Sequence, residues 1–427
     1  MLMSSKIKSI HARQLVDCKC RPMVEVDVVT EDGYVGRGCA PTGSSVGKFE
    51  SCVLRDEDPG EYHGLSVHKA VDNVNRIIAP ALTGMDVADQ KGIDQKMIEL
   101  DGTPEKKVLG GNAIYSVSIA VFRAVAEAAR QPLYNYIAGG PIQTVPVPSF
   151  NVVNGGCYGD LTQPFNEFII MPYGADTIYD SVEMGINTFQ ELEHVLAGYL
   201  GRKPEVAHAY GYAAPSEDPE VILELISEAI GRCGYTGKIG FAFDCASSEM
   251  YDGASNTYLL KGKRVSADEL IAYTKKLTEK FDFVFIEDLL DEEDWESYPK
   301  ANREITRTNI IGDDFIVTNR QRLERAYELK ALDGFILKPN QVGTITEALD
   351  TYRYAQDHGM LAITSGRAGG VIGDVVMDLA VGLGVGFIKN GAPRSGERID
   401  KLNFLMRACD LAPGCRLADI RPILKYI

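Results

Sequence analysis

Acidic residues end three successive apolar runs in the second half of the chain. GFAF is followed by Asp244, FVFI by the pair at 287–288 (Glu-Asp), and NIIG by the pair at 313–314 (Asp-Asp). Carboxylates that lie close together raise one another's pKa unless cations neutralise them. Oxygen ligands of this kind suit Mg²⁺, which binds a few carboxylates, several waters and an anionic substrate. The pattern therefore predicts a magnesium site.

Basic residues follow the later apolar runs. Lys338 comes after GFIL, Arg367 shortly after LAITS, and Lys389 after GVGFI. A single polar residue at the end of a strand is usually a helix cap or turn former, but here the pattern continues from run to run. Apolar residues precede Lys338, and partial burial beside bound cations would lower its pKa and make it a usable base.

Short apolar runs alternate with helical stretches from residue 141 onward. The runs GFAF, FVFI, NIIG, GFIL, LAITS and GVGFI, together with the earlier PVPSFNVV and FNEFIIMPY, make about eight strands. Repeated βα units imply a parallel sheet, and eight of them favour a closed (β/α)₈ barrel of the TIM type. The residues that end the strands would then meet at one face, where such enzymes do their chemistry. Neither GxGxxG nor GxxxxGK[ST] occurs as a nucleotide-binding turn, so nucleotide-binding folds lose support.

In the first part of the chain the apolar residues are spaced differently. Residues 22–40 alternate apolar and polar residues around a Glu-Asp-Gly turn, which indicates a β-hairpin. A Gly/Ser-rich loop follows, and residues 63–136 carry apolar residues at helical spacing. The break at Gly139-Gly140-Pro141 then predicts an α+β domain of residues 1–140 that precedes a barrel domain of residues 141–427.

Composition excludes several classes of protein. The 427 residues are 45% apolar and 24% charged, and no run of eighteen apolar residues could form a membrane span. Lys plus Arg is 44 and Asp plus Glu is 60, so the net charge is −16, which disfavours nucleic acid and anionic lipid as partners. The N-terminal segment lacks the apolar core of a signal peptide, and the nine cysteines are scattered. We therefore expect a cytoplasmic protein with reduced thiols.

Several long segments resemble the enolase family. They include VEVDVVTEDG, GNAIYSVSIAV, PVPSFNVVNGG, FDCASSEMYDG, IEDLLDEEDW, IIGDDFIVTN and ILKPNQVGTITEAL, spread over essentially the whole chain. The resemblance implies an α+β capping domain followed by an irregular barrel whose second strand is antiparallel. It also implies a small anionic carboxylate substrate, Mg²⁺ as cofactor, and a homodimer or higher homo-oligomer.

The resemblance assigns roles to residues at matching positions. Asp244, Glu287 and Asp313 match the ligands of the first Mg²⁺, and Ser45, in GSSVGKFE, matches the serine of a mobile loop that closes on the second. Four further residues match groups that contact the substrate. These are Lys338 as the base, Lys389 at the substrate carboxylate, Arg367 at the phosphate and Glu167 near the leaving hydroxyl.

The chain departs from the family pattern at the leaving group and the phosphate. Tyr158, in NGGCYGD, stands where the family has a histidine, and Tyr210, in AHAYGYAAP, stands where it has an acid glutamate. Gly366 replaces another histidine, and Ala368 replaces a serine. Tyr158, Tyr210 or His208 could substitute for the missing groups, although a tyrosine with a pKa near 10 is a poor replacement for a poised carboxyl.

The metal and enolising residues are thus kept while the leaving-group residues change. We predict a Mg²⁺-dependent lyase that removes the proton next to a carboxylate and eliminates water from 2-phosphoglycerate or a related 3-hydroxy acid. One alternative is a diverged enzyme that starts from the same enolate, for example one that resembles carboxyphosphonoenolpyruvate synthase. Another is a non-catalytic protein on the same fold, which would have no reason to retain three converging carboxylates.

Overall fold

The computed structural model describes residues 5–43, 47–156 and 163–427. The chain begins with an antiparallel sheet of β1 (Ile7–Val16), β2 (Pro22–Thr30) and β3 (Val35–Cys39). Gly33, with φ of +86°, makes the turn between β2 and β3 at the predicted Glu-Asp-Gly position. The predicted hairpin is therefore confirmed, and β1 extends it to a sheet.

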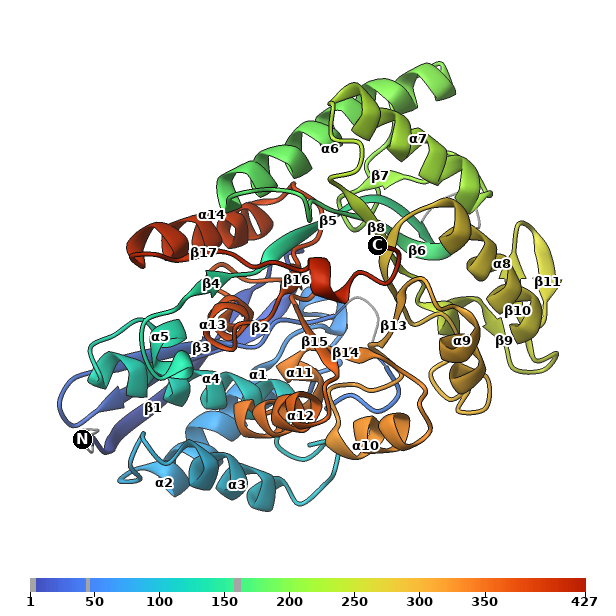
Figure 1. Cartoon of the computed structure of the whole chain (residues 1–427). Coiled ribbons are helices and arrows are strands. Elements are labelled where there is room, and N and C mark those ends of the chain that lie inside the picture. Colours follow the sequence, from blue (N-terminus) through green and yellow to red (C-terminus); the bar gives the residue numbers. More distant parts are fainter. Residues whose placement is uncertain (1–4, 44–46, 157–162) are drawn as a thin grey trace.

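Helix α4 (Gly111–Ala128) covers this sheet and is buried along almost its whole length (Figure 1). Its close approach depends on Gly36 and Gly38, because a Cβ at either residue would overlap the α4 backbone at Ala120 or Ser116. The remaining helices of this part lie around α4. They are α1 (His68–Asn73), α2 (Ala79–Leu82), α3 (Gln90–Asp101) and α5 (Leu133–Ala138).

Among the described residues, eight strands close into a barrel in the second part of the chain. Parallel pairing of the last strand with the first completes the ring. In chain order the strands are β5 (Val147–Gly156), β6 (Gln163–Met171), β8 (Gly240–Asp244), β12 (Phe283–Glu287), β13 (Asn309–Gly312), β14 (Gly334–Leu337), β15 (Leu361–Ser365) and β16 (Phe387–Lys389).

Strand β6 runs antiparallel to both of its neighbours, β5 and β8, whereas the other pairs are parallel. No helix of the described chain separates β5 from β6, so β6 returns beside β5 in the opposite direction. The strand count and period predict a barrel, and the resemblance predicts its irregular second strand. Both predictions are confirmed.

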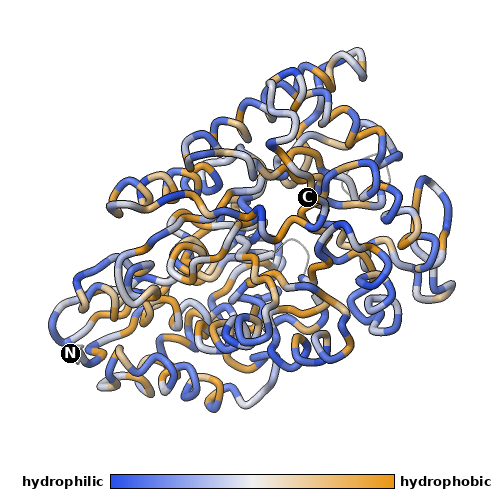
Figure 2. Tube along the Cα trace, in the orientation of Figure 1, coloured by the Kyte–Doolittle hydropathy of each residue, from blue (hydrophilic) through white to orange (hydrophobic). Residues whose placement is uncertain are grey.

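Helices surround the barrel and turn their apolar faces toward its strands (Figures 1 and 2). They are α6 (Ile178–Leu200), α7 (Pro219–Arg232), α8 (Ala267–Lys280), α9 (Tyr298–Glu304), α10 (Arg320–Glu328), α11 (Pro339–Val342), α12 (Ile345–Asp357), α13 (Val375–Gly382) and α14 (Gly396–Leu411). Capping boxes fix the starts of α6 and α8, at Thr177 with Asp180 and at Ser266 with Glu269.

Three small pairings lie outside the barrel ring. They are β7 (Tyr212–Ala213) beside β5, β4 (Thr144–Val145) with β17 (Arg416–Leu417), and the meander of β9 (Tyr251–Asp252), β10 (Thr257–Leu260) and β11 (Lys263–Val265). No helix in the described part of the chain is long and apolar enough to cross a membrane.

Candidate active site

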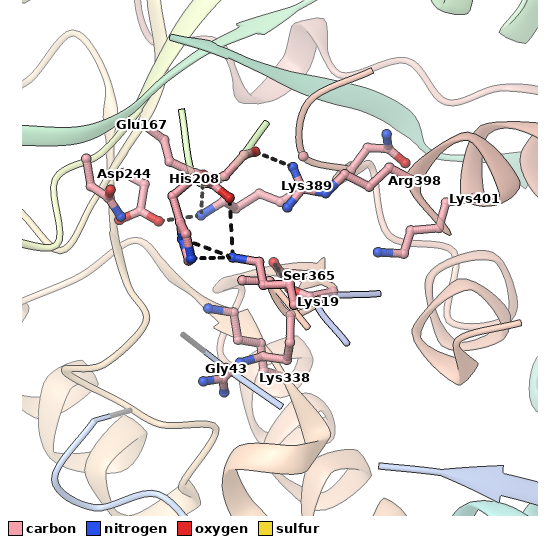
Figure 3. Close-up of a pocket in the computed structure, with 17 residues that line it drawn as sticks. Lys19, Gly43, Glu167, His208, Asp244, Lys338, Ser365, Lys389, Arg398 and Lys401 are labelled. Carbon is pink, nitrogen blue, oxygen red and sulfur yellow. Dashed lines mark hydrogen bonds and ion pairs between the residues drawn. The ribbon is translucent and has the colours of Figure 1, made fainter. Parts of the chain in front are cut away.

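A cavity opens where the barrel meets the first part of the chain. The sheet and loops before residue 140 contribute Lys19 and Gly43 to it, and the rest of the lining comes from the barrel (Figure 3). The barrel residues of the lining include Glu167, His208, Asp244, Lys338, Gly366, Arg367, Lys389, Arg398 and Lys401.

Two of the predicted metal ligands end adjacent parallel strands in register. Asp244 closes β8 and Glu287 closes β12, and the two residues pair directly. Lys389, at the end of β16, extends its ammonium between them, with Nζ 2.9 Å from Asp244 Oδ2 and 2.5 Å from Glu287 Oε2. This lysine therefore neutralises part of the negative charge of the two carboxylates.

Glu167 faces the same ammonium from β6. Its Oε2 lies 3.7 Å from Lys389 Nζ, and its Oε1 accepts a hydrogen bond of 2.8 Å from Asn151 Nδ2. Burial raises the pKa of Glu167, and Lys389 opposes that effect. Both carboxylate oxygens thus face donors.

The third predicted ligand, Asp313, follows β13 and is ion-paired with Lys338. Its other oxygen accepts a hydrogen bond of 2.9 Å from Gln341 Nε2. Burial lowers the pKa of Lys338, but the charges of Asp313 and Glu287 raise it, and the net pKa is raised. The direction is opposite to the sequence-based expectation, which assumed bound cations beside Lys338, because here the lysine is ion-paired with Asp313.

Among the residues that the structure describes, the acidic oxygens that gather within 4.8 Å of one another belong to Asp288, Asp313 and Asp314. This cluster shares only Asp313 with the predicted ligand set. Asp288 accepts the backbone amides of Asp313 (2.9 Å) and Asp314 (2.7 Å), and its own backbone is left-handed, with φ of +46°. Its carboxylate therefore positions the loop after β13, and its oxygens are already used by backbone donors.

The cavity carries more negative than positive charge at its base. The carboxylates of Glu167, Asp244, Glu287 and Asp313 face the two ammonium groups of Lys338 and Lys389. The Oε1 atom of Glu287 is buried and has no hydrogen-bond partner among the described residues. Burial, with the charge of Asp244, raises the pKa of Glu287 well above its usual range. An orphaned buried oxygen and an excess of hard ligands fit a divalent cation.

The predicted phosphate-binding arginine is held by a residue that the sequence did not single out. Arg367 makes a two-point ion pair with Glu50, at 2.9 and 3.0 Å, and both side chains are buried. Next to Arg367, Gly366 leaves room for another cation. A Cβ at this position would overlap Lys401 Nζ, so the ammonium fills space that a side chain at 366 would need.

Tyr210 is not part of the cavity lining, whereas its neighbours His208 and Ala209 are. The backbone of Tyr210 is left-handed, with φ of +70°, its ring lies 5.0 Å from the Arg398 guanidinium, and its hydroxyl donates to the carbonyl of Cys18 at 3.4 Å. Ser45 and Tyr158, to which the sequence also gives site roles, lie outside the described residues.

The structure adds cations that sequence reasoning missed. Lys19 comes from the turn between β1 and β2, and Arg398 and Lys401 come from one face of α14. Neither segment shows an apolar run that ends in a polar residue, which was the signal for the predicted site. The i, i+3 spacing of Arg398 and Lys401 was the available clue, although no helix was predicted at these residues.

Comparisons with known proteins agree with this architecture. The family model described as "Enolase, N-terminal domain" matches residues 7–137, and "Enolase, C-terminal TIM barrel domain" matches residues 142–413. A protein of Methanococcus aeolicus named Enolase is 41% identical over 405 residues, which cover 95% of each chain. Proteins of the same name from two strains of Methanococcus maripaludis are 42% identical over equal lengths and shares. The chain belongs to the enolase family.

Proposed function

We propose that this protein is a Mg²⁺-dependent hydro-lyase that converts 2-phosphoglycerate to phosphoenolpyruvate. The observation that carries the proposal is that Lys338 and Lys389, which both line the cavity, are ion-paired with four carboxylates, those of Asp313, Glu167, Asp244 and Glu287. The membership of the chain in the enolase family supports this reading. The excess of lysine and arginine on the rest of the lining favours an anionic substrate.

The first chemical step is removal of the proton next to the substrate carboxylate. A proton there is a weak acid because its loss creates a dianion. We assign its removal to Lys338, the largely buried amine beside Asp313, and the pairing of the substrate carboxylate to Lys389. A divalent cation held by Asp244, Glu287 and Asp313 would supply the charge that stabilises the dianion.

The phosphate end of the substrate meets a different part of the lining. Arg367 is buried and fixed by Glu50, so its guanidinium is already oriented and loses little conformational freedom on binding. Lys401, in the space beside Gly366, adds a second cation at this end. We infer that these two groups bind the phosphate.

Further expectations from the sequence remain proposals. We propose that residues 1–140 act as the capping unit and residues 141–427 as the catalytic unit, and that Ser45 and Tyr158 contribute to the closed site. We also propose that the protein acts in the cytoplasm and assembles as a homodimer or larger homo-oligomer. Mg²⁺ is the proposed cation because it suits a few carboxylates and an anionic substrate.

The test is a direct assay of phosphoenolpyruvate absorbance with purified protein, 2-phosphoglycerate and Mg²⁺. We expect turnover that depends on Mg²⁺ and that is abolished in Lys338→Ala. Lys8, exposed on β1, provides the control, and Lys8→Ala should retain full activity. Absence of turnover in the unmodified protein, or full turnover in Lys338→Ala, would rule the proposal out.

A further inference from the structure

An ammonium group from the first domain is held over the cavity by a residue of the barrel domain. Lys19 Nζ lies 3.1 Å from His208 Nδ1 and donates to the carbonyl oxygen of His208 at 3.3 Å. Both side chains line the cavity that contains Lys338 and Lys389 (Figure 3). The pair joins two segments that are 189 residues apart in the sequence.

The turn that carries Lys19 is fixed from within. The carboxylate of Asp17 accepts the backbone amides of Lys19 (2.8 Å) and Arg21 (3.0 Å), and it also binds the Arg21 guanidinium and the Thr42 hydroxyl. The hydroxyl of Tyr210 donates to the carbonyl of Cys18 at 3.4 Å. Tyr210 thus links the two loops, and these contacts hold the backbone of Lys19 in place beside the cavity.

The loop that carries His208 is also well supported. The amide of Ala207 donates to Gly211 O (2.8 Å), and the amide of Gly211 donates to Asn154 Oδ1 (3.0 Å) on β5. Arg398 donates to Ala209 O at 2.6 Å. This loop presents His208 to Lys19, close to the position at which the sequence alone pointed to Tyr210.

The charges around the pair favour release of a proton from Lys19. Burial, together with the charges of Arg21 and Arg398, lowers the pKa of Lys19 to about 8, against smaller opposing effects of Cys18 and Asp17. Burial lowers the pKa of His208 too, and Lys19 and Arg21 add to this. At neutral pH the pair is then an ammonium donor and a neutral imidazole acceptor.

We propose that Lys19 is the proton donor to the leaving hydroxyl and that His208 is the residue that positions it. This assignment rests on the proposed dehydration. Lys338 takes the proton from C2, and the electron pair left at C2 forms the C2–C3 double bond as the C3–O bond breaks. The departing hydroxyl takes a proton from the Lys19 ammonium and leaves as water. Lys19 then regains a proton from solvent, and Lys338 releases to solvent the proton that it took from C2.

Glu167 is the competing candidate for this role. Its Oε1 accepts from Asn151 and its Oε2 faces the Lys389 ammonium, so both oxygens are oriented as acceptors. Lys19, in contrast, is a donor with no lone pair while it is charged. The geometry therefore separates the two, because Glu167 lies beside Lys389 and Lys19 lies beside His208 (Figure 3).

The test separates the two halves of the reaction. In D₂O with 2-phosphoglycerate and Mg²⁺, exchange of the C2 hydrogen reports proton abstraction, and phosphoenolpyruvate absorbance reports elimination. Lys19→Met should retain exchange while elimination falls about 100-fold or more, the usual size of a general-acid effect. Lys338→Met should lose both, and Lys8→Met should lose neither. Lys19→Arg, which keeps the charge but does not release its proton, should behave like Lys19→Met.

The pH profile and the histidine variants test the pairing itself. Elimination by the unmodified protein should decline above about pH 8, and the residual activity of Lys19→Met should lack that decline. His208→Asn, which keeps an acceptor, should retain more elimination than His208→Leu.

Two results would overturn the assignment alone. They are normal elimination by Lys19→Met in an active enzyme, and loss of C2 exchange together with elimination in that variant. Inactivity of the unmodified protein in both assays would overturn the proposed function and this assignment with it.

Discussion

The ammonium of Lys389 lies 2.5 Å from Glu287 Oε2, at the ends of two barrel strands that are not neighbours in the sheet. Glu287 is fully buried, and its second oxygen is without a hydrogen-bond partner in the described chain. A buried carboxylate with one satisfied and one orphaned oxygen is costly unless a cation completes it. The need of Glu287 for positive charge explains why Lys389 lies beside a carboxylate that could also bind a metal ion.

The first prediction concerns cation binding at Glu287. Mg²⁺ at about 100 times its Kd should stabilise the protein by about 2.7 kcal/mol, which thermal unfolding detects as a higher Tm. Glu287→Gln removes the central ligand, so the Mg²⁺-dependent rise in Tm should be largely lost. Glu293→Gln, an exposed residue paired with Lys48, should keep the full rise. An unchanged rise in Glu287→Gln would show that the cation binds elsewhere.

The second prediction concerns the buried pair of Arg367 and Glu50. Removing one partner of a buried ion pair leaves an uncompensated charge, which costs about 3–5 kcal/mol. Glu50→Gln should therefore lower the free energy of unfolding in urea by about 3 kcal/mol. Glu293→Gln breaks the exposed pair with Lys48 and should cost only about 0–1 kcal/mol. Equal effects of the two variants would mean that the Arg367 pair is no more than a surface contact.

Strand-end residues were predictable because they follow apolar runs of strand length. The position of Asp244 and Glu287 needs only the count of strands and their parallel register. The pair at 287–288 shows where this reasoning stops. The apolar run alone does not tell which of Glu287 and Asp288 faces the cavity, and the choice of Glu287 came from the resemblance to the family.

Lys19, His208 and Glu50 could not be predicted in the same way. They lie in loops without periodicity, and only the tertiary fold brings the turn after β1 to the loop before β7. The left-handed backbone of Tyr210 is a further reason. His208 lines the cavity and Tyr210 does not, and matching positions along the chain carries no information on this difference.

The third prediction concerns pH and the buried Asp378 of α13. Burial raises the pKa of Asp378 to about 6, although Arg123 opposes this, whereas an unfolded aspartate has a pKa near 3.9. Between these values the folded state binds the extra proton, so stability is full below about pH 4 and is lost as the pH rises through 6. From pH 5 to pH 8 this loss amounts to about 1 kcal/mol.

Asp378→Asn removes the titrating group, so the variant should gain about 1 kcal/mol relative to the unmodified protein on going from pH 5 to pH 8. Urea unfolding at the two pH values measures this difference. Asp252→Asn serves as the control, because hydrogen bonds from Ser255 and Ala254 lower the pKa of this partly exposed residue, which moves it away from the tested range. A pH-independent difference for Asp378→Asn would contradict the prediction.

The fourth prediction concerns the space between Gly366 and Lys401. A methyl group at position 366 would overlap the Lys401 ammonium, which has to move from the cavity lining. If Lys401 binds the substrate phosphate, Gly366→Ala should raise KM with a smaller effect on kcat, because the lost contact is made equally to substrate and transition state. A loss of about 2 kcal/mol in binding would raise KM roughly thirtyfold. Steady-state kinetics measure this, with Gly198→Ala, where a methyl group meets open space on α6, as the control. An unchanged KM in Gly366→Ala would exclude Lys401 from the phosphate site.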